Sequence, residues 1–107
     1  MKIKKGDVVR IEKTGLMYSN YVDWVVNNIK DKQLLAEYCF EKSFYINDRK
    51  NTEEFDDYYR NAEFVVIKVA RHPEQEGKKL AYIRKSFGGG CFLIDVNGLE
   101  KVKDRWE

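Results

Sequence analysis

The sequence has few of the residues that mark secreted, membrane-spanning or metal-binding chains. It has one histidine, one proline and two cysteines among its 107 residues. No stretch approaches the roughly 20 apolar residues that cross a bilayer. The basic N-terminus MKIKKGDVV is not followed by the apolar segment of a signal peptide. We therefore expect a cytoplasmic domain whose two cysteines are reduced and partly buried.

An excess of charge of one sign is also lacking, because 20 Lys and Arg residues stand against 18 Asp and Glu residues, for a net charge of +2. A chain this close to neutral has no strong general attraction for nucleic acid or anionic membranes. The charge is unevenly spread, however. Residues 18–61 carry nine acidic and six basic side chains, a net of −3, and hold 10 of the 15 aromatic residues. The middle of the chain therefore differs in character from its ends.

Apolar residues make up 43% of the chain and aromatic residues 14%, which is enough to form one folded core. The length predicts a single domain over residues 1–107. Alternation of apolar and polar residues with a period of two predicts strands at 7–13, 63–71, 80–85, 91–96 and 99–102. In the second of these strands, the period places Val65, Ile67 and Val69 on one face. Phe64 and Val66 then lie on the other face.

Residues 19–61, between the first and second predicted strands, are expected to form a helical insertion. Ser19 or Asn20 is a good N-cap for a first helix, and Asp23 completes a capping box with Asn20. A second helix is predicted from Asp31, and a short third helix at about 52–60. Helical spacing gives the first helix one apolar face, formed by Tyr21, Trp24, Val25 and Ile29.

Five short strands, with the tight glycine connection 88–90 between the third and fourth, predict a mainly β fold. We expect a small SH3-like barrel of about five strands, with the helical insertion at about 19–61 after the first strand. A sheet of this size leaves exposed edges unless it closes or is covered, and the helices would cover one of them. An α+β fold with an open sheet is the alternative.

Two stretches of the chain also resemble known sequences. In GDVVRIEKTGLMYSNYVDW, the pairs Gly6-Asp7, Thr14-Gly15 and Tyr18-Ser19, together with Tyr21 and Trp24, resemble the opening of uncharacterised small phage and bacterial proteins with SH3-like barrels. The stretch YIRKSFGGGCFLIDVNGLEKV resembles the closing strands of the same proteins. Together the two stretches cover under half of the chain. The resemblance implies the barrel and a bacterial or phage setting, and it implies no catalytic or binding residues.

No residue pattern predicts catalysis or a metal site. His72 lies beside Pro73 in a charged loop without HxxxH, HxxE or CxxC spacing, which favours a solvated loop histidine. The glycines at 88–90 lack the Lys-Ser or Lys-Thr pair and the helix that follow them in a phosphate-binding loop. No motif supports Cys39 or Cys91 as a nucleophile, although parity alone also allows a disulfide between them. We expect no enzymatic activity, no cofactor and no metal.

The leading hypothesis is a non-catalytic interaction module that binds a protein or peptide partner. An acidic surface rich in aromatic residues docks proline-rich or basic peptides, because the rings supply contact area and the carboxylates attract cations. The other interpretation is that the aromatic residues pack the helices onto the sheet, and helical spacing favours it for Tyr21 and Trp24. The candidate binding residues are Tyr18, Tyr21, Trp24, Tyr58, Tyr59, Asp56 and Asp57.

A second hypothesis is weak, salt-sensitive binding of nucleic acid through a basic face of the barrel. Small barrels bind nucleic acid when a basic face carries aromatic residues for stacking, a role that Tyr82 or Phe87 would have here. Ordinary solvated charge is the alternative, and the net charge of +2 favours it. The basic residues in question are Lys2, Lys4, Lys5, Arg10, Lys78, Lys79, Arg84 and Lys85.

Overall fold

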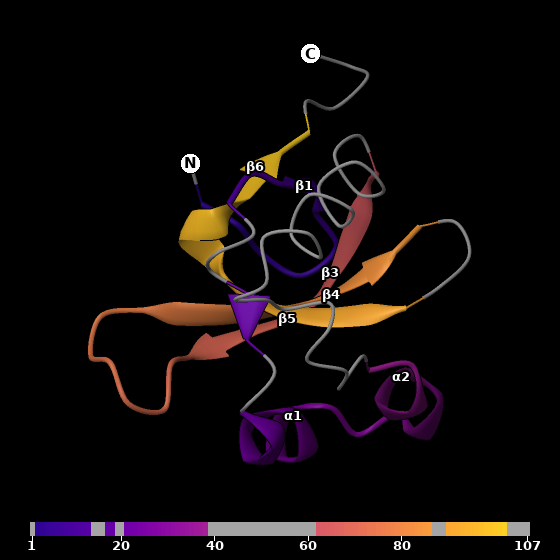
Figure 1. The fold of residues 1–107 in the computed structure, drawn as a ribbon, viewed down its shortest axis with the longest axis vertical. Coiled ribbons are helices and arrows are strands. Elements are labelled where there is room, and N and C mark those ends of the chain that lie inside the picture. The colour runs from indigo at the N-terminus through magenta and orange to yellow at the C-terminus, as the bar shows by residue number, and fades with distance from the viewer. Residues whose placement is uncertain (1, 14–16, 19–20, 39–61, 87–89, 103–107) are drawn as a thin grey trace, which may run out of the picture.

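The computed structural model describes residues 2–13, 17–18, 21–38, 62–86 and 90–102, and within these ranges the fold is mainly β. The mainly β prediction is thus confirmed. Figure 1 shows the elements in chain order. They are strands β1 (Val8–Ile11) and β2 (Met17–Tyr18), helices α1 (Val22–Asn28) and α2 (Lys32–Ala36), strands β3 (Phe64–Arg71), β4 (Lys79–Lys85) and β5 (Cys91–Asp95), the 3-10 turn η3 (Val96–Gly98) and strand β6 (Leu99–Lys101).

All five predicted strands are present, with ends that differ from the predicted ones by one or two residues. Strand β2 was not predicted, because two residues are too few to show a period. It exists through its pairing with β5, in which Met17 lies opposite Ile94 and Tyr18 opposite Leu93. The helix predicted at 52–60 lies outside the described residues.

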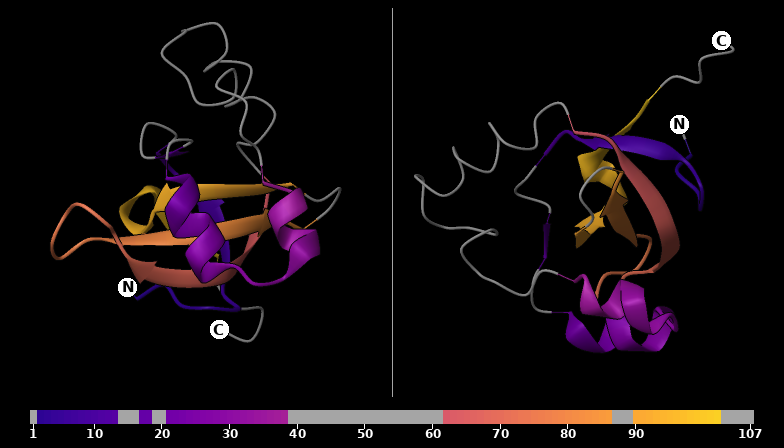
Figure 2. Two further views of the ribbon diagram at one scale, coloured as in Figure 1. Left: turned by 90° about the horizontal axis from the view of Figure 1, so that it is seen from below. Right: turned by 90° about the vertical axis from the view of Figure 1, so that its right-hand side faces the viewer.

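The strands form one antiparallel sheet with the order β2-β5-β4-β3-β1-β6. Strands β5 and β6 are four positions apart in this order, which is ~19 Å in a flat sheet. Only the turn η3 joins Asp95 to Leu99, and four residues of chain span at most ~14 Å. The sheet must therefore curl and bring β6 back toward β5, and Figure 2 shows this curvature.

A first group of buried apolar side chains, the inner core, gathers residues of β1, β3, β4, β5 and β6 inside this curl. Two of its rings, those of Phe64 and Phe92, meet edge to face with their centroids 5.9 Å apart. That strands far apart in the sheet order share one cluster agrees with the curl. The inner core consists of Val9, Ile11, Phe64, Val66, Ala81, Ile83, Phe92, Ile94 and Leu99.

A second group, the outer core, lies between the opposite side of β4 and β5 and the two helices, which cover that side in Figure 2. Residues along β4 alternate between the two groups, so that Leu80 and Tyr82 belong to the outer core while Ala81 and Ile83 belong to the inner core. Both faces of the central strands are therefore buried. The outer core consists of Trp24, Val25, Ile29, Tyr38, Leu80, Tyr82, Cys91 and Leu93.

Strand β3 departs from the predicted alternation. Its register against β4 shifts between Val66 and Lys68, which is the mark of a β-bulge. The extra residue moves Val69 to the inner-core side with Phe64 and Val66, while Ile67 packs against the outer core. The prediction that Val65, Ile67 and Val69 share a face is therefore wrong, because a strict period of two does not allow for a bulge.

The two helices begin differently. Helix α1 begins at Val22, with Tyr21 as its N-cap and no side-chain capping bond, so the predicted cap at Ser19 or Asn20 is wrong. Helix α2 begins at Lys32, next to the predicted start at Asp31, and Asp31 is its N-cap. One carboxylate oxygen of Asp31 accepts hydrogen bonds from the backbone N–H groups of Gln33 and Leu34, at 2.9 and 3.2 Å.

Candidate interaction surface

The structure describes the side chains of two of the seven predicted binding residues, Tyr21 and Trp24. Tyr18 is placed in the edge strand β2, where its backbone pairs with Leu93. The remaining four, Tyr58, Tyr59, Asp56 and Asp57, lie outside the described residues and stay predictions.

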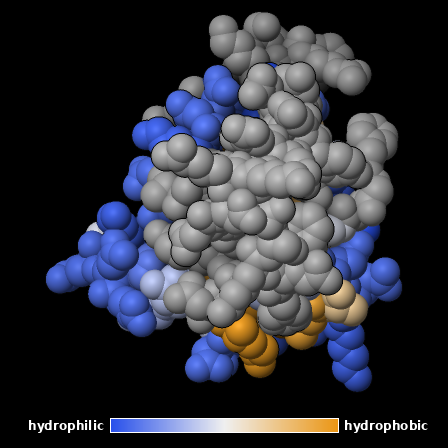
Figure 3. All heavy atoms as spheres, in the orientation of Figure 1, coloured by the Kyte–Doolittle hydropathy of each residue, from blue (hydrophilic) through white to orange (hydrophobic). Residues whose placement is uncertain are grey.

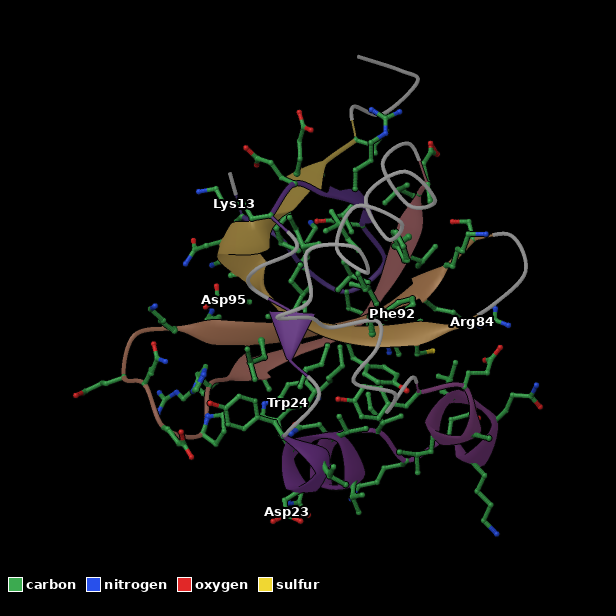
Figure 4. All side chains as sticks on the ribbon, in the orientation of Figure 1. Lys13, Asp23, Trp24, Arg84, Phe92 and Asp95 are labelled. Atoms are coloured by element: carbon green, nitrogen blue, oxygen red, sulfur yellow. The ribbon has the colours of Figure 1, made fainter. Side chains whose placement is uncertain are left out.

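Trp24 belongs to the interior and not to a surface. Its side chain is 6% exposed, and its indole Nε1–H donates a hydrogen bond of 2.9 Å to the backbone carbonyl of Arg71 at the end of β3. In Figure 4, Trp24 points from α1 toward the sheet, while Asp23 points away from it. The prediction that Trp24 binds a partner is therefore wrong, because the apolar face of α1 is used to pack the helix on the sheet.

Tyr21 is half-buried and joins α1 to the β3–β4 loop. Its ring meets the imidazole of His72 edge to face, with centroids 5.0 Å apart. Its hydroxyl lies 3.2 Å from a carboxylate oxygen of Glu74 and donates a hydrogen bond to it. Tyr21 therefore has a structural role, because it links the start of α1 to the β3–β4 loop.

The β3–β4 loop is organised around His72, whose side chain is 6% exposed. The prediction of a solvated histidine is wrong, because Tyr21 from a distant part of the chain packs against the ring. The imidazole Nδ1 accepts hydrogen bonds from the backbone N–H groups of Glu74 and Gln75, at 3.0 and 3.1 Å. An Nδ1 that accepts carries no hydrogen, so the neutral ring has its hydrogen on Nε2.

The same loop surrounds a hollow of about 570 Å³ lined by residues 71–79. Three basic side chains and two acidic ones line it, those of Arg71, Lys78, Lys79, Glu74 and Glu76. Mixed charge of this kind does not select a ligand of either sign. The hollow is lined by one continuous stretch, the β3–β4 loop with the strand residue on either side of it, so it is not the strongest candidate site.

The strongest candidate is the outward face of α1. Val22 and Val26 are 39% and 52% exposed, and they are the only large hydrophobic side chains that the structure finds exposed among the residues it describes. They lie four residues apart, which places them one above the other on the helix. Figure 3 shows apolar area at the lower edge of the molecule, where α1 lies. The exposed Asp23 belongs to the same turn.

Sequence reasoning missed these two valines, although a signal for them exists. The predicted inward face of α1 contains Trp24, Val25 and Ile29, and all three are buried. On a helical wheel with about 100° per residue, positions 22 and 26 lie about 40° apart and flank that buried face on the side of Ile29. Two further apolar residues beside the buried face of a short helix were the observation to make.

Three of the basic residues proposed for nucleic-acid binding belong to β4. Lys79 and Lys85 are the first and last residues of β4, so they lie ~20 Å apart along the strand. The guanidinium of Arg84 is bound to the carboxylate of Glu37. Tyr82 is fully buried, so its proposed stacking role is wrong, and Phe87 lies outside the described residues.

Within the described ranges, no three His, Cys, Asp or Glu side chains are grouped so that they could hold a metal ion. The thiol of Cys91 is buried in the outer core, and Cys39 lies outside the described residues. None of the helices formed by these residues is long and apolar enough to span a bilayer. In comparisons with known proteins, the chain matches no family model, no curated protein and no solved structure.

Proposed function

We propose that this chain is a non-catalytic interaction module that binds a protein or peptide partner through the outward face of α1. The observation that carries the proposal is the exposure of Val22 and Val26 on a helix whose other face is fixed in the outer core. Burying such apolar side chains against a partner is favourable, at roughly 25 cal/mol per Å² of apolar area.

Rigidity of α1 supports this use. Trp24, Val25 and Ile29 hold the helix to the sheet, and the indole hydrogen bond to Arg71 fixes its orientation. A surface that is already ordered does not lose conformational entropy when a partner binds. The exposed valines therefore form a preorganised contact.

Charge indicates what kind of partner fits. Asp23 is exposed beside Val22, Tyr21 holds Glu74 at the start of the helix, and residues 18–61 carry a net charge of −3. Carboxylates around an apolar contact attract cations and repel acidic partners. The partner we propose is a peptide segment that presents apolar side chains together with Lys or Arg.

A selection with a library of random 12-residue peptides tests the proposal. Peptides selected on the purified chain are expected to contain apolar and basic residues together. The double variant V22S/V26S is expected to bind them at least about tenfold more weakly, since it loses ~1.4 kcal/mol or more of apolar contact. Variant N27S is the matched control, because it introduces serine at an exposed polar position of the same helix.

Two results would contradict the proposal. One is selected peptides that bind V22S/V26S as tightly as they bind the unchanged chain. The other is a selection that yields no peptide whose binding is specific for the folded chain. Circular dichroism and the unfolding midpoint of V22S/V26S show whether the variant is folded, so lost binding is not confused with lost structure.

We also propose that the curled sheet is a small, partly open SH3-like barrel with the helical insertion after its first strand. The strand order, the hairpin between β4 and β5 and the three-residue turn between β5 and β6 support this interpretation. The test is a solution NMR structure. Nuclear Overhauser contacts from β6 to the side chains of both β2 and β5 are expected, and a lack of contacts between β2 and β6 would favour the open α+β sheet.

A further inference from the structure

Helix α2 stays in place through contacts with the sheet. It has five residues, Lys32–Ala36, and none of them is buried. A helix of this length is not stable on its own in water. Leu34 and Leu35 are half-buried and pack against the outer core, and Tyr38, two residues beyond the helix, is buried in it. We refer to Lys32–Tyr38 as the α2 segment.

Three polar contacts hold the α2 segment on β4 and β5. The hydroxyl of Tyr82 donates a hydrogen bond of 2.5 Å to the carbonyl of Leu34. The carboxylate of Glu37 accepts two hydrogen bonds from the guanidinium of Arg84, from Nε and from Nη2, each 2.9 Å long. The backbone N–H of Cys91 donates a hydrogen bond of 2.8 Å to the carbonyl of Glu37. All three contacts fall within residues 34–37.

The side chains of Tyr82 and Cys91 lie directly under this segment. Both are 0% exposed. Tyr38 forms a parallel bridge with Cys91, and its ring centroid lies 5.7 Å from that of Tyr82. Arg84, which binds Glu37, is also the cross-strand neighbour of Cys91. The segment therefore covers one corner of the outer core, where β5 begins.

The sheet under this corner is held more firmly than its cover. Strand β4 is paired along its length with β3 on one side and β5 on the other. The α2 segment touches these strands through a few side chains and the contacts named above. Structural units with few buried contacts open locally at a lower free energy than the global unfolding of the domain.

We infer that the α2 segment is a latch over the corner formed by Tyr82 and Cys91, which opens while the sheet stays folded, and that Glu37, Arg84 and Tyr82 keep it closed. Opening uncovers an apolar surface on β4 and β5 that the closed structure hides. The inference does not depend on the partner proposed for α1, because it concerns a different surface and needs no ligand.

Thiol labelling of Cys91 tests the latch. In a C39A background Cys91 is the one remaining cysteine, so the rate of its reaction with 5,5′-dithiobis(2-nitrobenzoate) reports how often it becomes accessible. We expect labelling in the absence of denaturant, with a rate that rises only weakly with urea, since opening the latch exposes little surface. Labelling through global unfolding would instead have a rate that rises steeply with urea, since unfolding exposes the buried surface of the whole chain.

Variants identify what keeps the latch closed. E37Q removes the charge that Arg84 binds and is expected to raise the labelling rate about threefold. Y82F removes the hydrogen bond to Leu34 and is expected to raise it about fivefold. E76Q is the matched control for E37Q, because it neutralises an exposed carboxylate in the β3–β4 loop, and it is expected to leave the rate unchanged.

The inference is wrong if labelling of every variant shows the urea dependence of global unfolding, or if no labelling occurs without denaturant. It is also wrong if E37Q and E76Q change the rate equally. The free energy of global unfolding is measured for each variant alongside, and an opening free energy from labelling that equals it would count against the latch.

Discussion

The inner and outer cores are built on opposite faces of the same two strands, but they are held together in different ways. The inner core joins β1, β3, β4, β5 and β6, which the backbone pairing of the sheet already brings together. The outer core joins β4 and β5 to two short helices that have no backbone ladder to the sheet. In the outer core, polar contacts hold the helices to the sheet, such as the hydrogen bond from the Tyr82 hydroxyl to the Leu34 carbonyl.

This difference separates two kinds of stability in one small fold. In the inner core, apolar burial and strand pairing reinforce each other, so disruption is expected to unfold the whole chain. In the outer core, single hydrogen bonds fix the position of each helix, for example that between Trp24 and Arg71. Losing one of them is expected to loosen a helix before it unfolds the sheet. The predictions below test this ranking.

The largest effect is expected from F92A in the inner core. Phe92 is fully buried and packs edge to face against Phe64, so its truncation removes a ring from a closed cluster. A loss of about 3–5 kcal/mol in the free energy of unfolding is expected. Urea unfolding followed by circular dichroism measures it. A loss below about 1.5 kcal/mol would mean that the inner core is not the main source of stability.

A smaller effect, about 2 kcal/mol, is expected from W24F in the outer core. The change keeps most of the apolar ring but removes the hydrogen bond from Nε1 to the Arg71 carbonyl and leaves a small cavity. V26A on the same helix is the control, and its exposed side chain is expected to change stability by less than about 0.5 kcal/mol. Equal losses for the two variants would show that α1 is not anchored through Trp24.

Tyr82 gives a prediction at high pH. Burial raises the pKa of its hydroxyl above the ordinary value of 10.0, so the folded chain keeps the proton that the unfolded chain releases above about pH 10. The stabilisation by this group is therefore fully present below pH 10 and is lost as the pH rises further. Y82F is expected to be about 1 kcal/mol less stable at pH 7, with a gap that narrows above pH 10 in urea unfolding. A stability difference between Y82F and the unchanged chain that stays constant above pH 10 would contradict the stabilising role of the Tyr82 hydroxyl.

The smallest effect is expected from E37Q, and it has the opposite pH dependence. Hydrogen bonds from Arg84 hold the pKa of the Glu37 carboxyl below its ordinary value of 4.5. The stabilisation by this pair is present above about pH 4.5 and is lost as the pH falls through the lower folded-state value. Melting temperatures of E37Q and the unchanged chain are therefore expected to differ at pH 7 and to converge toward pH 3. E76Q, compared over the same range, should show no such convergence.

The strands and the second helix start were predictable from the sequence, because their signals are local. Apolar stretches between loop and turn residues located β3, β4 and β5 to within a residue or two, and the helix predicted from Asp31 located α2. Helical spacing also predicted the apolar face of α1, since Trp24, Val25 and Ile29 are all buried. The assignment of Trp24 to a binding surface failed because packing on the sheet uses that face.

The remaining features depend on residues far apart in the chain. His72 is buried by Tyr21, 51 positions earlier, and Arg84 binds Glu37, 47 positions earlier. Strand β2 exists only through its pairing with β5. No local sequence pattern predicts such contacts. The exposed pair Val22 and Val26 is different, since its helical spacing is visible in the sequence once the buried face of α1 is known.

Hydrogen exchange of the backbone amides, followed residue by residue with NMR, tests the account most directly. Amides of β3, β4 and β5 that pair within the sheet are expected to exchange only by global unfolding, with one common free energy of opening. The amides of Leu35, Glu37 and Cys91, which bond within or to the α2 segment, are expected to exchange with a clearly lower free energy. Exchange of all these amides with the same free energy would contradict the claim that the two cores are held in different ways.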